Sequence, residues 1–246
     1  MTETHYIGGM HAVKALLKAQ SSNTQLLVVQ RGRRDSRIRS LVEMARRAQI
    51  DVQEMSKHDM DALAEGVEHQ GVLAQHSGQA PGSEADLFAL LHNQSGPLLL
   101  LILDGLQDPH NLGACLRSAD AAGVDAVIVP VDNSVGVTPV VRKVASGAAD
   151  TVPLFQVTNL TRTFEKLKQA GIWIYGSAAD ADKSLYQLDL LGSAAIVMGS
   201  EGSGLRRLTQ KACDEVFAIP MHGTVGSLNV SVATGICLFE VQRQRI

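Results

Sequence analysis

Three segments of the chain place polar side chains and glycines next to apolar runs, where they could hold a ligand and act on it. The first segment, Asp108 to Gly123, carries Asn111 and Arg117. An arginine can clamp a phosphate or stabilise a forming oxyanion, and an asparagine amide can orient a substrate. The alternative is a capped surface helix with an ordinary arginine, and the residues alone leave both interpretations open.

The first segment has the pattern of a helix that starts at Asp108 and Pro109. This helix would bury a stripe formed by Leu112, Leu116 and Ala119. Asn111 and Arg117 are outside the stripe and lie about 240° apart on an ideal helix. They can share a site only if Asn111 is in the opening turn and faces the ends of the strands.

The second segment, Ile196 to Leu208, is an apolar run that leads through Gly199, Gly202 and Gly204 into a helical pattern. Glycines let a backbone approach a ligand closely, and the N–H groups of such a turn could bind an anion. The spacing matches neither the phosphate loop of nucleotide-hydrolysing enzymes nor the dinucleotide-binding fingerprint. A simple loop is an equally good interpretation.

The third segment, Ala218 to Ile236, opens a predicted helix with Ser227, Asn229 and Ser231. Polar side chains at a helix start are usually caps, and Ser227 or Asn229 could be only that. The histidines closest to the three segments are His110 and His222. Neither has a second ligand at metal spacing, so we predict no metal site and expect both to be exposed loop residues.

A parallel sheet would position these segments. Five apolar runs read as strands, at Leu98 to Leu103, Ala126 to Val129, Ile172 to Tyr175, Ala194 to Met198 and Val216 to Ile219. They alternate with helical patterns at Asn111 to Ala122, Leu160 to Ala170, Leu205 to Cys213 and Val230 to Gln242. Continuous apolar strands separated by helices indicate an α/β fold with a parallel sheet covered on both faces. In such a sheet, ligands bind beyond the carboxyl ends of the strands.

A stretch rich in Gly, Pro and Ser divides the chain. We expect a domain at residues 1–77, a linker at 78–95 that holds one short helical candidate at Glu84 to His92, and a domain at 96–246. The first domain reads as a small α/β unit. Its predicted helices are Met10 to Lys18 and a helix from a Ser36 cap to Ala48, and its predicted strands are Gln25 to Gln30 and short runs near Val52 and Val72.

Composition and charge exclude several classes of protein. With 246 residues, 45% hydrophobic and 19% charged, the chain is not disordered or fibrous. A net charge of −3 argues against a protein that coats nucleic acid indiscriminately. Seven arginines nevertheless crowd into residues 31–47, against only two acids, at Arg31, Arg33, Arg34, Arg37, Arg39, Arg46 and Arg47. They predict either a phosphate-binding patch or a solvated helix face.

Two further features concern the compartment. The longest apolar run is far shorter than the roughly 20 residues that span a bilayer, and the N-terminus shows no basic flank before an apolar segment. We therefore expect a soluble, cytoplasmic protein. Cys115, Cys213 and Cys237 are widely spaced, so we expect reduced thiols with packing roles.

In their order, the three segments closely resemble the motifs of the SPOUT class of RNA methyltransferases, in the branch that methylates ribose 2′-hydroxyls. The first motif is matched by Asn111, Gly113, Arg117, Ser118 and Ala119. The second is matched by Met198, Gly199, Glu201, Gly204 and Leu205, and the third by Ser227 to Ser231. The resemblance covers the C-terminal domain from roughly Gly96 onward.

The resemblance implies that the last strands and the C-terminal helix form a deep trefoil knot, which ordinary topology rules would exclude. It also implies a homodimer, no metal, and S-adenosylmethionine as the methyl donor. By position, the donor would contact Met198, Gly199, Ile219 and Leu228.

The N-terminal part resembles the small ribosomal-protein-like RNA-binding domain of family members that methylate a guanosine in the peptidyl-transferase region of 23S rRNA. The implied substrate is 23S rRNA or a large-subunit precursor. The implied RNA contacts are Arg31, Arg33, Arg34 and Arg37.

Methyl transfer to a ribose hydroxyl needs an in-line approach and the loss of a proton from a weakly acidic alcohol. The family assigns activation of the hydroxyl to the position of Arg117. A guanidinium with a pKa above about 12 is a poor base at neutral pH. We therefore interpret Arg117 as a phosphate clamp and electrostatic stabiliser of the forming alkoxide. The orienting residues would be Asn111, Glu201, Ser227 and Asn229.

Three alternatives compete with this function. A tRNA guanosine 2′-O-methyltransferase is the main rival, since related enzymes act on tRNA. A non-catalytic RNA-binding module would predict erosion of Arg117, Glu201 or Asn229, all of which are present. A Rossmann-type oxidoreductase fits the α/β pattern but not the missing dinucleotide fingerprint.

Overall fold

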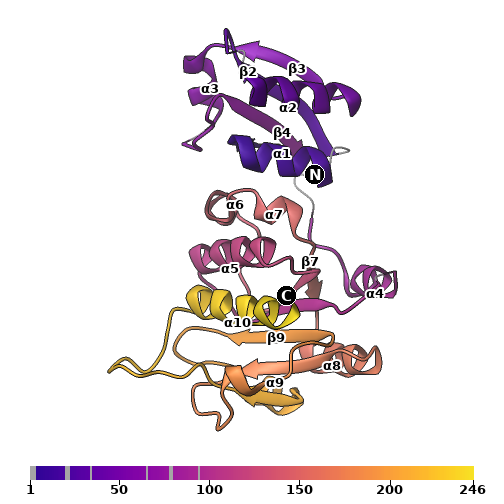
Figure 1. The fold of residues 1–246 in the computed structure, drawn as a ribbon, viewed down its shortest axis with the longest axis vertical. Coiled ribbons are helices and arrows are strands. Elements are labelled where there is room, and N and C mark those ends of the chain that lie inside the picture. The colour runs from indigo at the N-terminus through magenta and orange to yellow at the C-terminus, as the bar shows by residue number, and fades with distance from the viewer. Residues whose placement is uncertain (1–3, 20–22, 34, 65, 78–79, 94) are drawn as a thin grey trace. The chain divides into compact units, whose positions relative to one another are not determined.

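The structure is a computed structural model that describes residues 4–19, 23–33, 35–64, 66–77, 80–93 and 95–246 (Figure 1). The chain divides into two compact units. The first comprises Met1–Ala80 and Ser146–Thr151, and the second comprises Pro81–Ala145 and Val152–Ile246. No helix within the described ranges is long and apolar enough to cross a membrane.

The first unit is built on a four-stranded sheet in the order β1-β4-β2-β3. Its strands are β1 (Thr4–Gly8), β2 (Thr24–Gln30), β3 (Asp51–Met55) and β4 (Val72–Ser77). Its helices are α1 (Met10–Ala19), α2 (Ser36–Arg47), α3 (Lys57–Leu63) and the short α7 (Ala148–Thr151). Leu27 and Val29 of β2 pack with α1 and α2, whereas Val28 packs with Met60 of α3. Alternate residues of one strand thus serve the two faces of the sheet.

The N-cap of α2 lies one residue earlier than predicted. Its N-cap is Asp35, not Ser36, and the Asp35 carboxylate accepts hydrogen bonds from the backbone N–H groups of Arg37 and Ile38. Hydrogen bonds from Arg33 and Ile38 keep the pKa of Asp35 below its usual value. A carboxylate in extended backbone satisfies two N–H groups of the first turn, which Ser36 inside the helix does not.

The second unit contains a six-stranded sheet in the order β10-β8-β9-β5-β6-β7, with every paired strand parallel. The strands are β5 (Leu99–Asp104), β6 (Ala126–Pro130), β7 (Leu154–Val157), β8 (Trp173–Ser177), β9 (Ala194–Gly199) and β10 (Glu215–Phe217). The helices are α4 (Glu84–His92), α5 (Pro109–Ala121), α6 (Pro139–Ala145), α8 (Leu160–Gln169), α9 (Arg207–Ala212) and α10 (Val230–Arg245), with a short turn of 3₁₀ helix at Leu185–Gln187.

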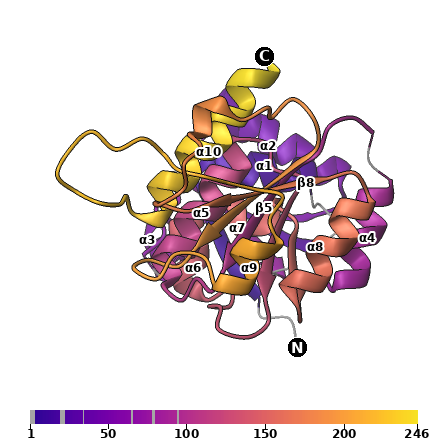
Figure 2. The ribbon, with the colours of Figure 1, turned by 90° about the horizontal axis from the view of Figure 1, so that it is seen from below.

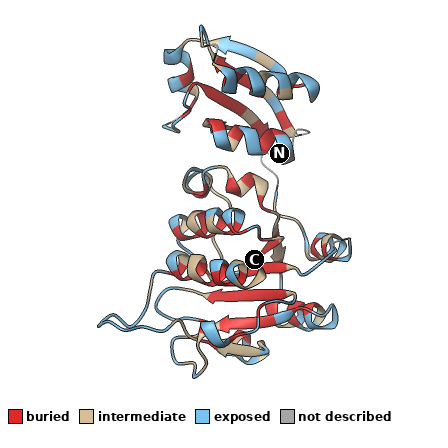
Figure 3. Ribbon diagram, viewed as in Figure 1, coloured by how far each residue is buried: buried red, intermediate tan, exposed pale blue. Residues whose placement is uncertain are grey.

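Helices cover both faces of this sheet (Figure 2). Helices α4 and α8 bury Leu87 and Phe164 against residues of β5, β6 and β9. On the opposite face α10 contacts both α5 and β9. The central strands are therefore buried throughout, as Figure 3 shows, and their continuous apolar runs are explained.

Residues 78–95, expected as a linker, contain α4, whose Leu87 and Leu91 are part of the core of the second unit. Gly82 forms a bridge with Phe155 of β7, so the chain joins the second unit before α4 begins. Five of the helices and strands that the structure describes were not expected from the sequence, namely β1, α3, α6, α7 and β7. Each has seven residues or fewer, too short for a clear periodic pattern.

The end of the C-terminal helix is held by the loop that precedes β9. The Gln244 side chain accepts from the N–H of Leu190 and donates to the carbonyl of Leu188. The Arg245 guanidinium donates to the carbonyls of Leu190 and Gly192. These contacts hold the end of α10 against the segment that precedes β9. The knot itself stays a prediction.

Candidate active site

The ends of β5 and β9 meet where the direction of the sheet connections reverses. Asp104, the last residue of β5, pairs in register with Gly199, the last residue of β9. Strands β6 and β7 continue the sheet on one side of this point, and β8 and β10 on the other. The carboxyl ends of strands at such a switch point form the usual ligand site of an open α/β sheet.

A cavity of about 640 Å³, within the range of small-molecule sites, lies at the carboxyl ends of β8 and β9. Its walls come from residues 177–180 after β8, residues 198–205 after β9, the segment between β10 and α10, Gln210 of α9, and the first turn of α10. In Figure 1 the segment between β10 and α10 extends to the left of the sheet. The apolar residues that line the cavity include Met198, Leu205, Ile219, Leu228 and Val230.

The turn after β9 depends on its glycines. A Cβ atom on Gly199 would lie 2.1 Å from the carbonyl carbon of Gly204, which no side chain tolerates. Ser200 and Gly204 exchange two backbone hydrogen bonds across the turn. Gly202 and Gly204 have φ values of 82° and 65°, in the left-handed region. The backbone of Gly204 and Leu205 thus packs directly against Gly199, and this close packing fixes the shape of the turn at the cavity.

An ion pair closes the base of the turn. The carboxylate of Asp104 is fully buried and accepts hydrogen bonds from the guanidinium of Arg206, at 2.6 Å from Nε, and from the Arg206 backbone N–H at 3.2 Å. Neither residue lines the cavity. Sequence reasoning missed both, although an acid that ends an apolar strand was a signal that could have found Asp104.

One side-chain amide connects the three polar segments. The Asn229 Nδ2 group donates to Asn111 Oδ1 at 2.9 Å and to a carboxylate oxygen of Glu201. The Asn229 Oδ1 atom accepts from the backbone N–H of Ser231 at 2.9 Å and caps α10. The opposite orientation of the amide would place its oxygen against the Glu201 carboxylate, so the network selects this one.

The structure separates the predicted residues into two groups. Seven of them line the cavity, namely Met198, Gly199, Glu201, Ile219, Ser227, Leu228 and Asn229. Asn111 is buried in the opening turn of α5 behind them and joins them through Asn229. Asp108 caps this helix by accepting from the N–H of His110, with Pro109 in the first turn, as predicted.

Arg117 is not brought into the cavity. It lies on the exposed side of α5, and its side chain makes no hydrogen bond or ion pair with the residues that the structure describes. The two residues of the first motif therefore point in different directions, as their separation of about 240° on the helix requires. An active site that includes both Asn111 and Arg117 therefore needs an Arg117 that does not come from the wall of the same cavity.

The cavity is acidic. Its titratable lining residues among the described positions are Asp180 and Glu201, and no lysine, arginine or histidine joins them. Such a site attracts a ligand with positive charge and disfavours a phosphate. Sequence reasoning missed Asp180, because an acid in an exposed loop carries no distinctive pattern. In the described parts of the chain no cluster of His, Cys, Asp or Glu could hold a metal ion.

The predicted RNA contacts of the first unit differ in their environments. Arg31 and Arg37 are exposed. Arg33 is half-buried and donates to the Asp35 carboxylate at 2.8 Å and to the carbonyl of Gln70. Arg33 thus ties the start of α2 to the turn before β4. Arg34 lies outside the described residues.

Two family models match the chain. Residues 98–239 match the SpoU rRNA Methylase family, and residues 6–81 match the family described as RNA 2′-O ribose methyltransferase substrate binding. The chain is 54% identical over 245 residues to a protein of Shewanella oneidensis and 52% identical over 245 residues to one of Pseudomonas syringae pv. tomato. Both are named 23S rRNA (guanosine-2′-O-)-methyltransferase RlmB. The matches cover 100% of this chain, and 99% and 98% of those proteins.

Solved structures share the fold. The SpoU methyltransferase AviRb from Streptomyces viridochromogenes, in complex with AdoMet, matches with a TM-score of 0.75 and 23% identity, over 98% of this chain and 90% of that one. A structure described as RNA 2′-O ribose methyltransferase matches with a TM-score of 0.73 and 25% identity, over 99% and 90% of the two chains. Both likenesses extend over nearly the whole chain, so they include both of its units.

Proposed function

The chain belongs to the SpoU rRNA methylase family, and on this premise we propose that it methylates the ribose 2′-hydroxyl of a guanosine in 23S rRNA, with S-adenosylmethionine as methyl donor. This substrate is supported by relatives named 23S rRNA (guanosine-2′-O-)-methyltransferase, whose sequences are about half identical to this chain over nearly their full length. The observation that carries the chemistry is the meeting of the three motifs at Asn229, on the wall of an acidic and largely apolar cavity.

The cavity fits the donor. S-adenosylmethionine supplies a methyl group on a positively charged sulfur, and it also carries an ammonium group and an adenine ring. Asp180 and Glu201 give the cavity the opposite charge, and the apolar walls suit the adenine. Met198, Gly199, Ile219 and Leu228 are the proposed donor contacts.

The remaining residues act on the RNA. Hydrogen bonds from Asn229 join it to Asn111 and Glu201. Together with Ser227, which lines the same cavity, these residues orient the ribose, and such positioning lowers the barrier. Arg117 stabilises the oxygen as it loses its proton and clamps a neighbouring phosphate. The acidic cavity would repel the phosphate, so a cation from outside the cavity wall suits this role.

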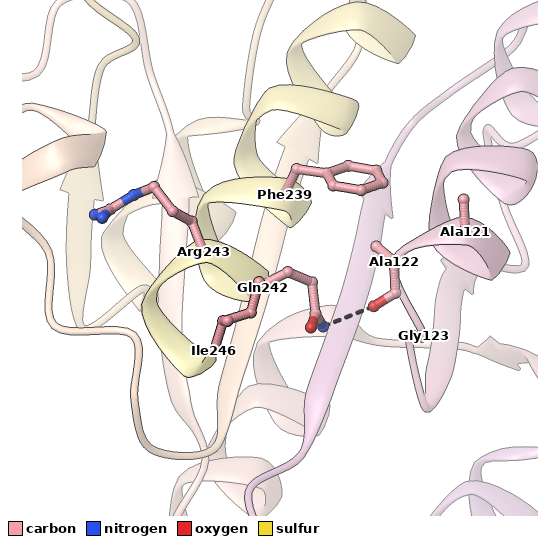
Figure 4. Close-up of a pocket in the computed structure, with 7 residues that line it drawn as sticks. All are labelled: Ala121, Ala122, Gly123, Phe239, Gln242, Arg243 and Ile246. Atoms are coloured by element: carbon pink, nitrogen blue, oxygen red, sulfur yellow. Dashed lines mark hydrogen bonds between the residues drawn. The ribbon is translucent and has the colours of Figure 1, made fainter.

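We further propose that the enzyme is a homodimer paired through α10. Val232 and Phe239 of α10 and Ile246, the residue after the helix, recur every seven residues, and all three are exposed, Phe239 by 52%. A hollow of about 700 Å³ beside them is lined by Phe239 and Ile246 and by the end of α5 (Figure 4). A second copy would cover this stripe and could bring its Arg117 to the cavity of the first.

The dimer has a direct test. Sedimentation should give about twice 26.2 kDa at micromolar concentration, and Phe239→Arg should give the monomer. Mixing subunits that carry Arg117→Ala with subunits that carry Leu228→Arg should restore activity, because a mixed dimer holds one intact cavity and one intact Arg117 opposite it. A fully active wild-type monomer would refute the dimer.

The substrate has its own test. The protein is incubated with radiolabelled donor and either unmodified 23S rRNA or tRNA, and the labelled nucleotide is mapped. We expect label on one guanosine ribose of 23S rRNA. Label on tRNA would favour the tRNA enzyme, and no label on either RNA or on a large-subunit precursor would favour a binding module. Ribosome assembly in bacteria, the organisms of the relatives, takes place in the cytoplasm, where we place the protein.

A further inference from the structure

We propose that the ion pair between Asp104 and Arg206 holds the turn at residues 199–205 in its donor-binding shape, so that both are positioning residues for donor affinity. The inference deepens the proposed function, because it takes the ligand of this turn to be S-adenosylmethionine. The turn supplies seven residues of the cavity wall. Neither Asp104 nor Arg206 lines the cavity, so their influence on a ligand must pass through the turn.

Among the described residues, the Asp104 carboxylate has hydrogen bonds to Arg206 alone. Its Oδ1 accepts from two nitrogens of the Arg206 guanidinium, and its Oδ2 accepts from the Arg206 backbone N–H. The Asp104 side chain is 0% exposed, whereas that of Arg206 is 50% exposed. A buried carboxylate is expensive unless it is paired and hydrogen-bonded, so the pair is strongly favoured over an open arrangement.

The pair fixes both ends of the turn to one strand. The first residue of the turn, Gly199, is the register partner of Asp104 in the sheet. The other end of the turn runs into Arg206, which is bound to Asp104. The turn itself is narrow, since Ser200 and Gly204 bond to each other across it. Its tip places the Glu201 carboxylate on Asn229. Movement at the base would therefore shift the donor-facing backbone and Glu201 together.

The start of α9 also depends on the ion pair between Asp104 and Arg206. Arg206 is the N-cap residue of this helix, but its side chain makes no capping hydrogen bond. The backbone N–H of Arg206 and its guanidinium both bind Asp104 instead. The ion pair thus sets where the turn stops and the helix begins, a task that a capping side chain performs elsewhere in the chain, as at Asp35.

The test measures donor binding to the full-length protein by calorimetry, without RNA. Arg206 is half exposed, so Arg206→Gln should fold and raise the dissociation constant by at least about tenfold, because charged hydrogen bonds are removed. Arg206→Lys keeps the charge and should bind with intermediate affinity. The matched control is Lys166→Gln, which removes the 2.7 Å ion pair of Lys166 with Glu84 between α8 and α4. It should leave the dissociation constant unchanged.

A double-mutant cycle separates this role from a general loss of stability. If Asp104→Asn and Arg206→Gln act through one contact, the double variant should bind the donor no more weakly than the worse single variant. Amide exchange at Gly204, which donates to Ser200, should accelerate in Arg206→Gln more than exchange in the core strands. A merely structural role would accelerate both alike.

Two results would overturn the inference. One is an Arg206→Gln variant that binds the donor within twofold of the wild type. The other is a pair of single effects that multiply in the double variant. A wild-type protein that binds no donor would overturn the proposed function and this inference with it, and the wild-type titration detects that case by itself.

Discussion

Asn229 donates a hydrogen bond to Asn111 at 2.9 Å, although 118 positions separate them in the chain. The second N–H of the same amide binds Glu201, and the amide oxygen caps α10. This one side chain therefore links the segments that follow β5, β9 and β10. From the sequence alone Asn229 could be only a helix cap, whereas the structure shows that its amide also bonds to Asn111 and Glu201.

Asn229→Asp tests the link without removing the cap. Aspartate still accepts from the N–H of Ser231, so the melting temperature should change little. Its second oxygen would face the carboxylate of Glu201 and the carbonyl of Asn111, where the amide donated. We expect kcat for methyl transfer to fall about a hundredfold. Asn229→Ser, an uncharged cap, should lose less, and an Asp variant of near-normal kcat would contradict the assignment.

Arg117→Ala should abolish methyl transfer while the fold and donor affinity persist. Arg117 is exposed and has no partner among the described residues, so its removal should change stability by no more than about 0.5 kcal/mol. Removal of a charge that stabilises the forming oxyanion should reduce kcat about a hundredfold or more. Calorimetry with the donor, thermal melts and a methyl-transfer assay measure the three properties. Substantial residual turnover would refute the catalytic role.

Leu228→Arg should prevent donor binding. Leu228 lines the cavity, and an arginine there can reach the two carboxylates that we expect to attract the donor, Asp180 and Glu201. The new side chain would occupy the donor's volume and neutralise its charge partners. Calorimetry should show no binding, whereas the apolar variant Leu228→Met should bind within a few fold of the wild type. Unchanged affinity in the arginine variant would place the donor elsewhere.

The sequence predicts the second unit well where the chemistry is local. Leu98 to Leu103 and Ala194 to Met198 are uninterrupted apolar runs, and both are central strands, found as β5 and β9. Asp108 and Pro109 predict the start of α5 within one residue. Helix geometry predicts that Asn111 and Arg117 lie on different sides of α5, and the structure has Asn111 buried in the opening turn and Arg117 exposed.

Contacts that depend on distant residues could not be predicted in this way. From the sequence, Arg33 is one more cation of the arginine cluster. In the structure its guanidinium donates hydrogen bonds to Asp35 and to the carbonyl of Gln70. Asp104 and Arg206 are 102 positions apart, and no local pattern relates them. Gly199 reads as room for a ligand, but the atom that excludes a side chain belongs to Gly204.

Alkaline pH should destabilise the protein through its thiols. Burial raises the pKa of Cys115 to about 11 and of Cys237 to about 12, from 9.0 in an exposed thiol. The unfolded chain releases these protons at lower pH than the folded chain, so stability is fully present below pH 9 and is lost as the pH rises toward 12. Burial also raises the pKa of Tyr175, with the same sign.

Urea unfolding at pH 8 and pH 10 measures this effect. The free energy of unfolding should fall with pH, and the fall should be smaller in Cys237→Ala, which removes one of the contributing groups. At neutral pH all three thiols should react slowly with an alkylating reagent in the folded protein and rapidly in urea. An equal fall in the variant and the wild type would show that Cys237 does not contribute.

The first unit should bind RNA through Arg31 and Arg37. Both are exposed, and neither side chain has a partner within the described part of the chain. The double variant Arg31→Gln and Arg37→Gln should raise KM for 23S rRNA and reduce the salt slope of binding by about one unit for each phosphate that the protein no longer binds. Donor affinity and the methylated nucleotide should not change, because these residues contact the backbone and do not read bases.

Two control variants show whether the effect is specific to Arg31 and Arg37. Lys14→Gln with Lys18→Gln removes the same charge from exposed positions on α1, and should change KM less if the arginines make specific contacts. Arg33→Gln should instead lower the melting temperature, since Arg33 bonds to Asp35 and to the carbonyl of Gln70. If the Arg31 and Arg37 variant keeps the wild-type KM and salt slope, the cluster is a solvated face. RNA selection must then lie in other residues, because the acidic cavity of the second unit cannot supply phosphate contacts.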